Sequence, residues 1–336
     1  MCGDKHVRMV KLNGDHVKHR TVENSSSPAV SRSLSFRIHF IPARTGHSDS
    51  SAGIPSRDSQ GRSPCPLPLG QNRRVAQAAE PCYVYGMTRQ LTVHLLPSLF
   101  EPADLQGGTA VMIDVLRAST TITHALAGGA AQIVPCSTID EAQAIRTATD
   151  GCLLGGERGG EIIPGFDLGN SPAAYARDVV SGQTIAFTTT NGTRALLRSS
   201  QAAQILVGTF PNLDAVVGHL ESADRPVHLV CAGTDGFVST EDTLFAGAVC
   251  DRLELKADFV FNDAARLAQS HWQVCSRTEE ALFKAILAGR GGQNVNRLGA
   301  VEDIRAATSR NGFDLVPEFL PQSRAIVLVN GQATDC

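Results

Sequence analysis

From residue 87 onward, short runs of β-branched and other apolar residues alternate with stretches whose apolar positions recur at helical spacing. Strands are predicted at 91–96, 109–113, 132–135, 152–154, 184–187, 204–207, 227–230 and 325–329. Helices are predicted at 119–127, 139–149, 171–180, 193–198, 213–220 and 240–253, and mainly helix is expected beyond 258. Ser171 and Pro172 are typical of the cap and first position of the helix at 171–180. The alternation predicts an α/β fold with a mostly parallel sheet and helices on both faces.

Residues 1–86 show neither pattern. They are rich in Ser, Pro, Arg and Gly and contain 12 Lys and Arg residues against 6 Asp and Glu. Such a segment cannot bury enough apolar surface to offset the entropy lost on ordering, so we expect a disordered basic leader. The pattern changes at Met87, which makes a mis-assigned start the alternative interpretation. The folded domain is then 87–336, in one lobe or two.

Charge and cysteine usage narrow the class of protein. Residues 87–336 contain 18 Lys and Arg against 27 Asp and Glu, within a net charge of −3 for the 336-residue chain. An acidic domain does not suit nucleic acid, although a divalent cation can bridge it to a small anionic substrate. No apolar run reaches the roughly 20 residues of a membrane helix, and the first 30 residues contain no signal-peptide core. The nine cysteines lack CxxC spacing, so we expect reduced thiols in a cytoplasmic protein that binds no membrane.

Four predicted strands run into loops that are rich in glycine, hydroxyl groups and charge. The carboxyl ends of parallel strands meet at one edge of a sheet, so these loops are expected to lie together. Carboxylates there suit a hard cation, while arginine, hydroxyl groups and free backbone N–H groups suit phosphate oxygens. The loops are 114–121 with Asp114 and Arg117, 155–172 with Glu157 and Arg158, 188–194 with the sequence TTTNGTR, and 231–242 with Cys231, Glu241 and Asp242.

Each loop also has a purely structural interpretation. Asp114 is typical of a helix cap, and the glycine-rich loop at 155–172 of a flexible surface segment. Ser239 and Asp242 resemble a capping box. Cys231, which follows an apolar strand, is typical of a small buried residue. No single loop decides the matter, but their predicted convergence favours a functional site.

Five motifs in this order resemble those of the 2-phosphosulfolactate phosphatase (ComB-like) family. They are DVLRASTT at 114–121, GERGG at 156–160, GFDLGNSP at 165–172, TTTNGT at 188–193, and CAG at 231–233 with Glu241 and Asp242. The resemblance extends from about 92 to 328 and includes Asp303 with Ile304, while 1–86 has no counterpart. It implies a three-layer α/β fold, a homodimer, and Mg²⁺-dependent hydrolysis of 2-phosphosulfolactate to sulfolactate and phosphate, a step toward coenzyme M. A related small phosphorylated acid remains an open choice of substrate.

The side-chain chemistry of these motifs leads to a hypothesis for the roles of individual residues. Mg²⁺ is expected on Asp114, Glu157 and one or both of Glu241 and Asp242. The residues expected to bind the phosphoryl group are Arg117, Ser119, Thr120, Thr188, Thr189, Thr190, Asn191, Gly192 and Thr193. Arg158 is expected to face the sulfonate or carboxylate. Attack by water, by Asp114 or by Cys231 is open, and Asp167 is a further candidate ligand or general acid.

Two other interpretations bear on function. A haloacid-dehalogenase-type phosphatase needs Asp-x-Asp after its first strand. Leu116 occupies the second acidic position here, so the usual acid–base residue is missing and this interpretation is disfavoured. A domain that binds or senses small phosphorylated or sulfonated acids without turnover is the alternative from another class. It predicts binding that does not depend on the carboxylates, whereas hydrolysis predicts that Asp114→Asn or Glu157→Gln abolishes phosphate release.

Overall fold

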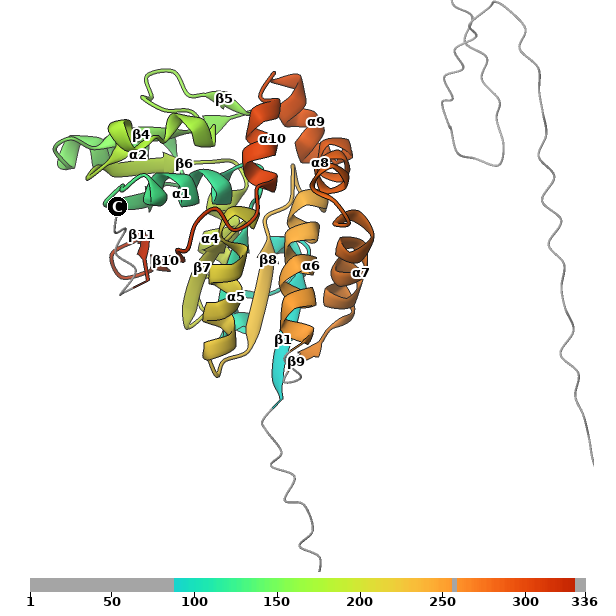
Figure 1. Cartoon of the computed structure of the whole chain (residues 1–336). Helices are drawn as coiled ribbons and strands as arrows, with labels where there is room; N and C mark the ends of the chain where they lie inside the picture. Colours follow the sequence, from blue (N-terminus) through green and yellow to red (C-terminus); the bar gives the residue numbers. More distant parts are fainter. Residues whose placement is uncertain (1–87, 256–258, 330–336) are drawn as a thin grey trace, which may run out of the picture. The chain divides into compact units, whose positions relative to one another are not determined.

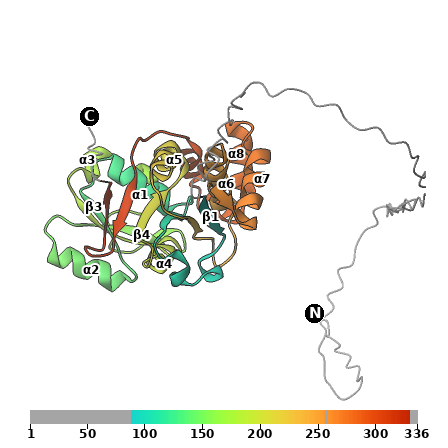
Figure 2. The same ribbon diagram turned by 90° about the horizontal axis from the view of Figure 1, so that it is seen from below.

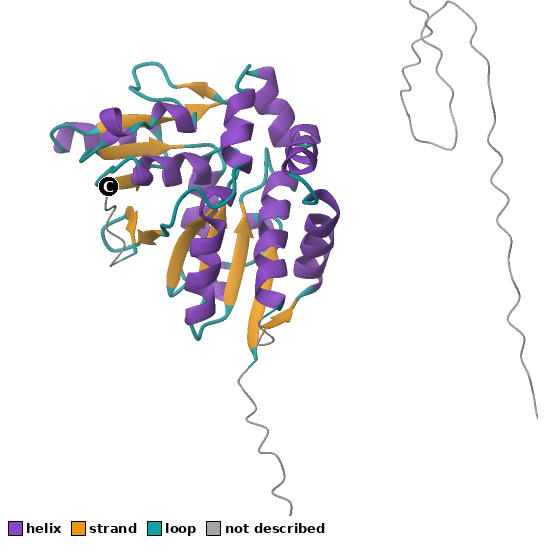
Figure 3. Cartoon of the chain, in the orientation of Figure 1, coloured by secondary structure: helices purple, strands orange, loops and turns teal. Residues whose placement is uncertain are grey.

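The computed structural model of the chain describes residues 88–255 and 259–329, in which strands and helices alternate (Figures 1 and 3). The predicted leader at 1–86 and the start at Met87 lie outside these residues, as do Cys2, Cys65, Cys82 and Cys336. The described cysteines are all free thiols. Among the described helices, none has both the length and the apolar character that a membrane crossing requires.

The strands and helices have the following bounds. The strands are β1 Arg89–His94, β2 Thr109–Ile113, β3 Gln132–Pro135, β4 Leu153–Arg158, β5 Glu161–Ile162, β6 Thr184–Thr188, β7 Gln204–Gly208, β8 Val227–Cys231, β9 Phe259–Phe261, β10 Pro317–Leu320 and β11 Ala325–Leu328. The helices are α1 Ala118–Ala127, α2 Ile139–Ala148, α3 Arg177–Val180, α4 Gly192–Arg198, α5 Leu213–Ser222, α6 Thr240–Glu254, α7 Asp263–Cys275, α8 Glu279–Ala288, α9 Arg290–Arg297 and α10 Val301–Thr308. Short 3₁₀ turns occur at Pro97–Leu99, Pro102–Leu105, Pro172–Ala174 and Phe210–Asn212.

The described strands form one sheet in the order β5-β4-β6-β3-β11-β10-β7-β2-β8-β1-β9. Strands β4, β6 and β3 are parallel to one another, and so are β7, β2, β8, β1 and β9. The β10–β11 hairpin lies between these two groups and pairs antiparallel with both. The predicted, mostly parallel sheet is therefore confirmed, as two parallel groups joined by a hairpin.

The hairpin reverses the strand direction from one group to the other. Three antiparallel pairings separate β7 from β3, so the two parallel groups run in opposite directions. In a flat sheet their carboxyl ends would lie at opposite edges. The sheet turns strongly, however, and Figure 1 shows β4 and β6 running across the view while β7 and β8 run up it. The carboxyl ends of both groups consequently point toward the same region.

Alternation along the central strands builds a core on each face of the sheet. In β2, Val111 and Ile113 belong to a core formed with α5, α6 and α7, while Ala110 and Met112 belong to a second core formed with α1 and α4. Successive strand residues point to opposite faces, so a fully apolar strand needs cover on both. Figure 2 shows α5 and α4 on opposite sides of the strands. The expected three-layer α/β fold is confirmed.

The expected helix at 171–180 is wrong. The segment forms the 3₁₀ turn Pro172–Ala174 and the short helix α3, and the Ser171 side chain makes no capping hydrogen bond. Its hydroxyl donates instead to Oδ1 of Asp303 at 2.6 Å. A tertiary contact across 132 residues has thus replaced the local cap that the sequence suggested.

Candidate active site

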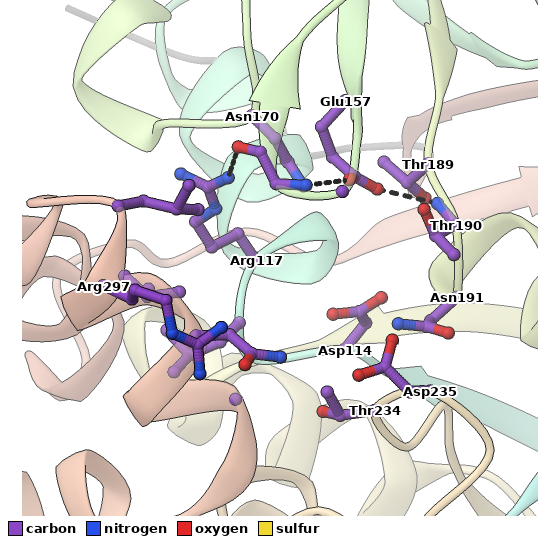
Figure 4. Close-up of a pocket in the computed structure, with 17 residues that line it drawn as sticks. Asp114, Arg117, Glu157, Asn170, Thr189, Thr190, Asn191, Thr234, Asp235 and Arg297 are labelled. Carbon is purple, nitrogen blue, oxygen red and sulfur yellow. Dashed lines mark hydrogen bonds between the residues drawn. The ribbon is translucent and has the colours of Figure 1, made fainter. Parts of the chain in front are cut away.

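A cavity of about 330 Å³ lies where the loops after β2, β4, β6 and β8 meet α9 (Figure 4). The described residues that line it are Asp114, Leu116, Arg117, Glu157, Gly159, Gly160, Asn170, Thr189, Thr190, Asn191, Thr234, Asp235, Gly291, Asn294, Val295, Arg297 and Leu298. The four predicted strand-end loops therefore meet as expected. They meet because the two strand groups turn toward each other.

Asp114 lies directly after β2 and is 5% exposed. Its backbone N–H donates to Ser119 Oγ at 2.8 Å, and the N–H of Ala118 approaches its Oδ1 at 3.4 Å. Burial, followed by the nearby charge of Asp242, raises the pKa of the Asp114 carboxyl well above its usual value. A Cβ on Gly192 would lie 2.9 Å from Asp114 Oδ2, so only glycine permits this close approach of the α4 turn.

Glu157, at the end of β4, connects two loops of the cavity wall. Its Oε2 accepts a hydrogen bond from Gly160 N at 2.7 Å, and its Oε1 accepts one from Thr190 N at 2.8 Å. The side chain is 7% exposed and lines the cavity. The carboxylate thus fixes the β4–β5 turn against the turn that follows β6, and its charge favours both backbone donors.

Arg117 is held by partners on distant segments. Its Nη1 forms a 2.8 Å ion pair with Asp303 Oδ2, and its Nη2 donates to Gly160 O at 2.6 Å. Because Asp303 also accepts from Ser171, the guanidinium group has a defined position in the wall. Asp303 on α10 belongs to the C-terminal pattern noted in the sequence.

Glu241 and Asp242, at the start of α6, lie behind the cavity and do not line it. Both oxygens of Asp242 accept backbone N–H groups, from Val115 at 2.9 Å and Gly233 at 3.0 Å. The capping box, which was the structural alternative for this segment, does not form, since the Ser239 side chain makes no capping hydrogen bond. Burial raises the pKa of Glu241 to about 8 and that of Asp242 to about 6. One oxygen of Glu241, Oε2, has no hydrogen-bond partner among the described residues.

Of the hydroxyl-bearing residues expected to bind the phosphoryl group, some line the cavity and others only support its loops. Ser119 and Thr120 are fully buried and do not line the cavity. The Thr120 hydroxyl donates to Val115 O at 2.8 Å, so it stabilises the loop after β2. The members of the turn after β6 that line the cavity are Thr189, Thr190 and Asn191, and those that do not are Thr188, Gly192 and Thr193.

Arg158 turns away from the cavity. Its guanidinium donates to Glu157 O at 2.7 Å and to Thr188 Oγ1 at 2.8 Å, and it is not among the lining residues. The sulfonate or carboxylate contact expected of it therefore lacks support from its position.

Asp167 and Cys231 also lie outside the cavity. Asp167 pairs with Arg146 at 2.7 Å and accepts from Leu154 N at 2.8 Å, near the amino end of β4. Cys231, the last residue of β8, is fully buried. Burial, and then the nearby charge of Asp242, raises the pKa of its thiol well above the usual value. A buried, protonated thiol is a poor nucleophile.

The cavity includes polar residues that the sequence did not single out: Asn170, Thr234, Asp235, Asn294 and Arg297. Asn170 and Asp235 lie inside loops already noted, and Asp235 has a positive φ of 56° in the turn after β8. Polar side chains at a strand-end turn were a usable signal for both. Arg297 and Asn294 come from α9, which follows no strand of the central sheet, so no strand-end argument could find them.

The oxygen donors of the cavity fit Mg²⁺ only when water and substrate complete its coordination. No three His, Cys, Asp or Glu side chains of the described residues are arranged to hold a metal ion by themselves. Mg²⁺, however, usually keeps several waters and binds one or two carboxylates together with substrate phosphate oxygens. Asp114, Asn191 and Asp235 surround one part of the cavity in Figure 4. Burial and the neighbouring carboxylates disfavour the ionised form of Asp114, and a hydrated Mg²⁺ beside it would offset that repulsion.

Comparison with known proteins identifies the family. The family model described as 2-phosphosulpholactate phosphatase matches residues 94–321, a range that contains every cavity-lining residue. A protein of Thermotoga petrophila named "Probable 2-phosphosulfolactate phosphatase" is 41% identical over 212 residues, 63% of this chain and 89% of that protein. Proteins with the same name from Caldanaerobacter subterraneus (37% over 218 residues, 64% of this chain and 89% of that protein) and Deinococcus radiodurans (38% over 234 residues, 69% and 94%) are similar as well. The chain belongs to the 2-phosphosulfolactate phosphatase family.

Proposed function

We propose that the protein is a Mg²⁺-dependent phosphatase that hydrolyses 2-phosphosulfolactate, or a related small phosphorylated acid, to sulfolactate and phosphate. The observation that carries this proposal is the cavity itself, where buried Asp114 faces the hydroxyl and amide groups of the turn after β6. Family membership supports the same substrate class. Two arginines in the wall match a substrate that carries acid groups besides its phosphate.

Asp114 and Asp235 are the residues best placed to hold Mg²⁺, with Glu157 as a further oxygen donor from the facing strand group. When bound, the cation neutralises charge that develops on the phosphoryl oxygens and lowers the pKa of coordinated water. Asp242 acts from behind, since its charge adds to the negative potential at Asp114, whereas Glu241 keeps its proton until the pH approaches about 8.

The phosphoryl group is held by Thr189, Thr190 and Asn191, whose side chains line the cavity opposite α9. The N–H of Thr190 is fixed by Glu157, which sets the orientation of this turn before substrate arrives. Arg117, fixed by Asp303, binds the carboxylate beside the phosphate ester. Water is the proposed nucleophile, because the thiol of Cys231 is buried away from the cavity and Asp114 is assigned to the cation.

The deciding experiment measures phosphate release by the full chain from racemic 2-phosphosulfolactate and a panel of small phosphorylated acids, with Mg²⁺ and with a chelator. Turnover that requires Mg²⁺ and prefers the sulfonate supports the proposal. Turnover on another phosphorylated acid keeps the chemistry and changes the substrate. Binding without turnover, unaffected by Asp114→Asn, would favour the sensing domain instead.

Location and assembly are parts of the same proposal. The five described cysteines are free thiols, which supports a reducing compartment such as the cytoplasm. The homodimer and the place in coenzyme M synthesis are carried by the family resemblance alone and stay predictions.

A further inference from the structure

One cation in the cavity wall is free to bind a ligand. Two guanidinium groups line the cavity, those of Arg117 and Arg297. Arg117, proposed above to bind the carboxylate, shares its charge with Asp303 at 2.8 Å. Arg297, the last residue of α9, is exposed, and its side chain forms no hydrogen bond or ion pair with any residue that the structure describes. Its charge is therefore available to an anion in the cavity.

Arg297 lies at the opposite end of the cavity from the proposed phosphoryl site. Figure 4 draws it across the cavity from Thr190 and Asn191. Asn294, three residues earlier on α9, lines the cavity as well, because residues three apart share one face of a helix. Helix α9 thus presents a guanidinium and an amide to the far end of a bound substrate.

A second unpartnered polar group lies in the same wall. Asn170 is 6% exposed and its Oδ1 has no hydrogen-bond partner among the described residues. Its neighbour in the chain, Ser171, is bonded to the Asp303 that fixes Arg117. That oxygen is buried and only accepts hydrogen bonds, so it does not contact the ionised acid groups of the substrate. The assignment of the sulfonate therefore rests on Arg297 and Asn294.

The chemistry of the substrate assigns its groups to these two arginines. In 2-phosphosulfolactate the carboxylate is on the carbon that carries the phosphate, and the sulfonate is one carbon farther away. With the phosphoryl group beside Asp114 and Asn191, the sulfonate reaches farthest toward α9. We propose that Arg297, assisted by Asn294, binds the sulfonate and determines the preference for phosphate esters with a second strong acid at the distal carbon. This inference rests on the proposed function.

A structural role for Arg297 makes a different prediction. A cation in the last turn of a helix also stabilises the helix through its exposed carbonyl groups. That role would affect unfolding but not the choice between substrates. Preference between two substrates therefore distinguishes the roles.

The test compares racemic 2-phosphosulfolactate with 2-phospholactate, which has hydrogen in place of the sulfonate. The values of kcat/KM are measured for the full chain, for Arg297→Gln and for the control Arg290→Gln. Arg290 is on the same helix, stacks over Phe237 at 4.3 Å and does not line the cavity. Loss of one charge-assisted contact in Arg297→Gln is expected to reduce the preference for the sulfonate about tenfold to a hundredfold, chiefly through KM. The control is expected to keep the wild-type preference.

Sulfolactate binding, measured by calorimetry without turnover, provides a second readout. Its Kd is expected to rise about tenfold or more in Arg297→Gln. Equal losses on both substrates, or an unchanged preference, would overturn the inference while leaving the phosphatase proposal intact. If the wild-type chain hydrolyses neither ester, the proposed function fails, and the calorimetry alone decides the sulfonate site. Equal Kd values for sulfolactate in wild type and in Arg297→Gln would then overturn the assignment of the sulfonate to Arg297.

Discussion

Replacing Asp114 with asparagine should abolish most activity and yet stabilise the metal-free protein. Ionised Asp114 is unfavourable in the fold because its carboxyl is buried beside like charges, which raises its pKa. The asparagine keeps the oxygen that the N–H of Ala118 approaches at 3.4 Å and removes the charge. Loss of the proposed cation site should lower kcat/KM by about a hundredfold or more, since a metal supplies several kcal/mol of charge stabilisation.

The stabilisation should grow with pH. A raised pKa means that the folded state holds the Asp114 proton more tightly than the unfolded state does. The wild-type free energy of unfolding therefore falls as pH rises from the usual aspartate value toward the folded-state pKa, and Asp114→Asn removes that fall. The difference between variant and wild type should be small near about pH 4 and should increase as the pH rises above it.

Glu157→Gln should have the opposite effect on stability. The carboxylate accepts from Gly160 N at 2.7 Å and Thr190 N at 2.8 Å, and an amide can accept only one of these bonds. The other N–H would then face an NH₂ group without a partner. Losing one charge-assisted bond in a buried site costs about 2–3 kcal/mol, which for a domain of this size lowers the melting temperature by about 5–10 °C.

Urea unfolding and thermal melts of both variants, in chelator and at several pH values, check this pair. Phosphate release is measured on the same samples. The reasoning would be refuted if the melting temperature of Asp114→Asn were several degrees below that of wild type while that of Glu157→Gln equalled the wild-type value. Asp114 would then be a structural residue and Glu157 a dispensable wall residue.

Three further outcomes follow from the described contacts. In Gly247→Ala the new Cβ would lie 2.1 Å from Ala268 O where α6 crosses α7, so the free energy of unfolding in urea should fall by about 2–3 kcal/mol. In the control Gly218→Ala the new Cβ meets nothing within 4 Å, so the free energy of unfolding should rise by about 0.5–1 kcal/mol. Cys231→Ala should leave kcat essentially unchanged, whereas a large loss, or an acid-stable phosphoenzyme that disappears in the variant, would make the thiol the nucleophile. Because the pKa of Glu241 is raised to about 8, its stabilising proton is lost as pH rises to that value. Glu241→Gln should therefore flatten the fall in unfolding free energy between about pH 5 and 8, measured by urea titrations in chelator.

The sequence predicted most of the fold because each element has a local cause. The strand at 109–113 is apolar throughout, as a strand covered on both faces must be, and the structure buries all five residues of β2. The helix at 139–148 is capped by Thr138, whose hydroxyl accepts from Glu141 N. Strand ends were predictable too, and with them the positions of Asp114 and Glu157 in the cavity wall.

What the sequence missed depends on partners far away in the chain. Strand β10 is four residues long and begins with a proline, so its local pattern is weak, and only its pairing with β7 and β11 makes it a strand. Ser171 left its expected cap for a hydrogen bond to Asp303. Arg297 lies in the cavity because α9 crosses the strand ends, which no local signal encodes.

The β10–β11 hairpin determines how the two halves of the site face each other. Glu157 and Thr190 come from the strand group of β4 and β6, whereas Asp114 and Asp235 come from the group of β2 and β8. The hairpin is the described sheet's only link between these groups, and its Phe319 is 3% exposed in the core beneath α1. Opposed strand directions let the carboxyl ends face each other across a cavity, where a single parallel edge would leave an open crevice. The distance between the phosphoryl-binding turn and the proposed cation ligands is therefore set by packing of the hairpin, well away from the reacting atoms.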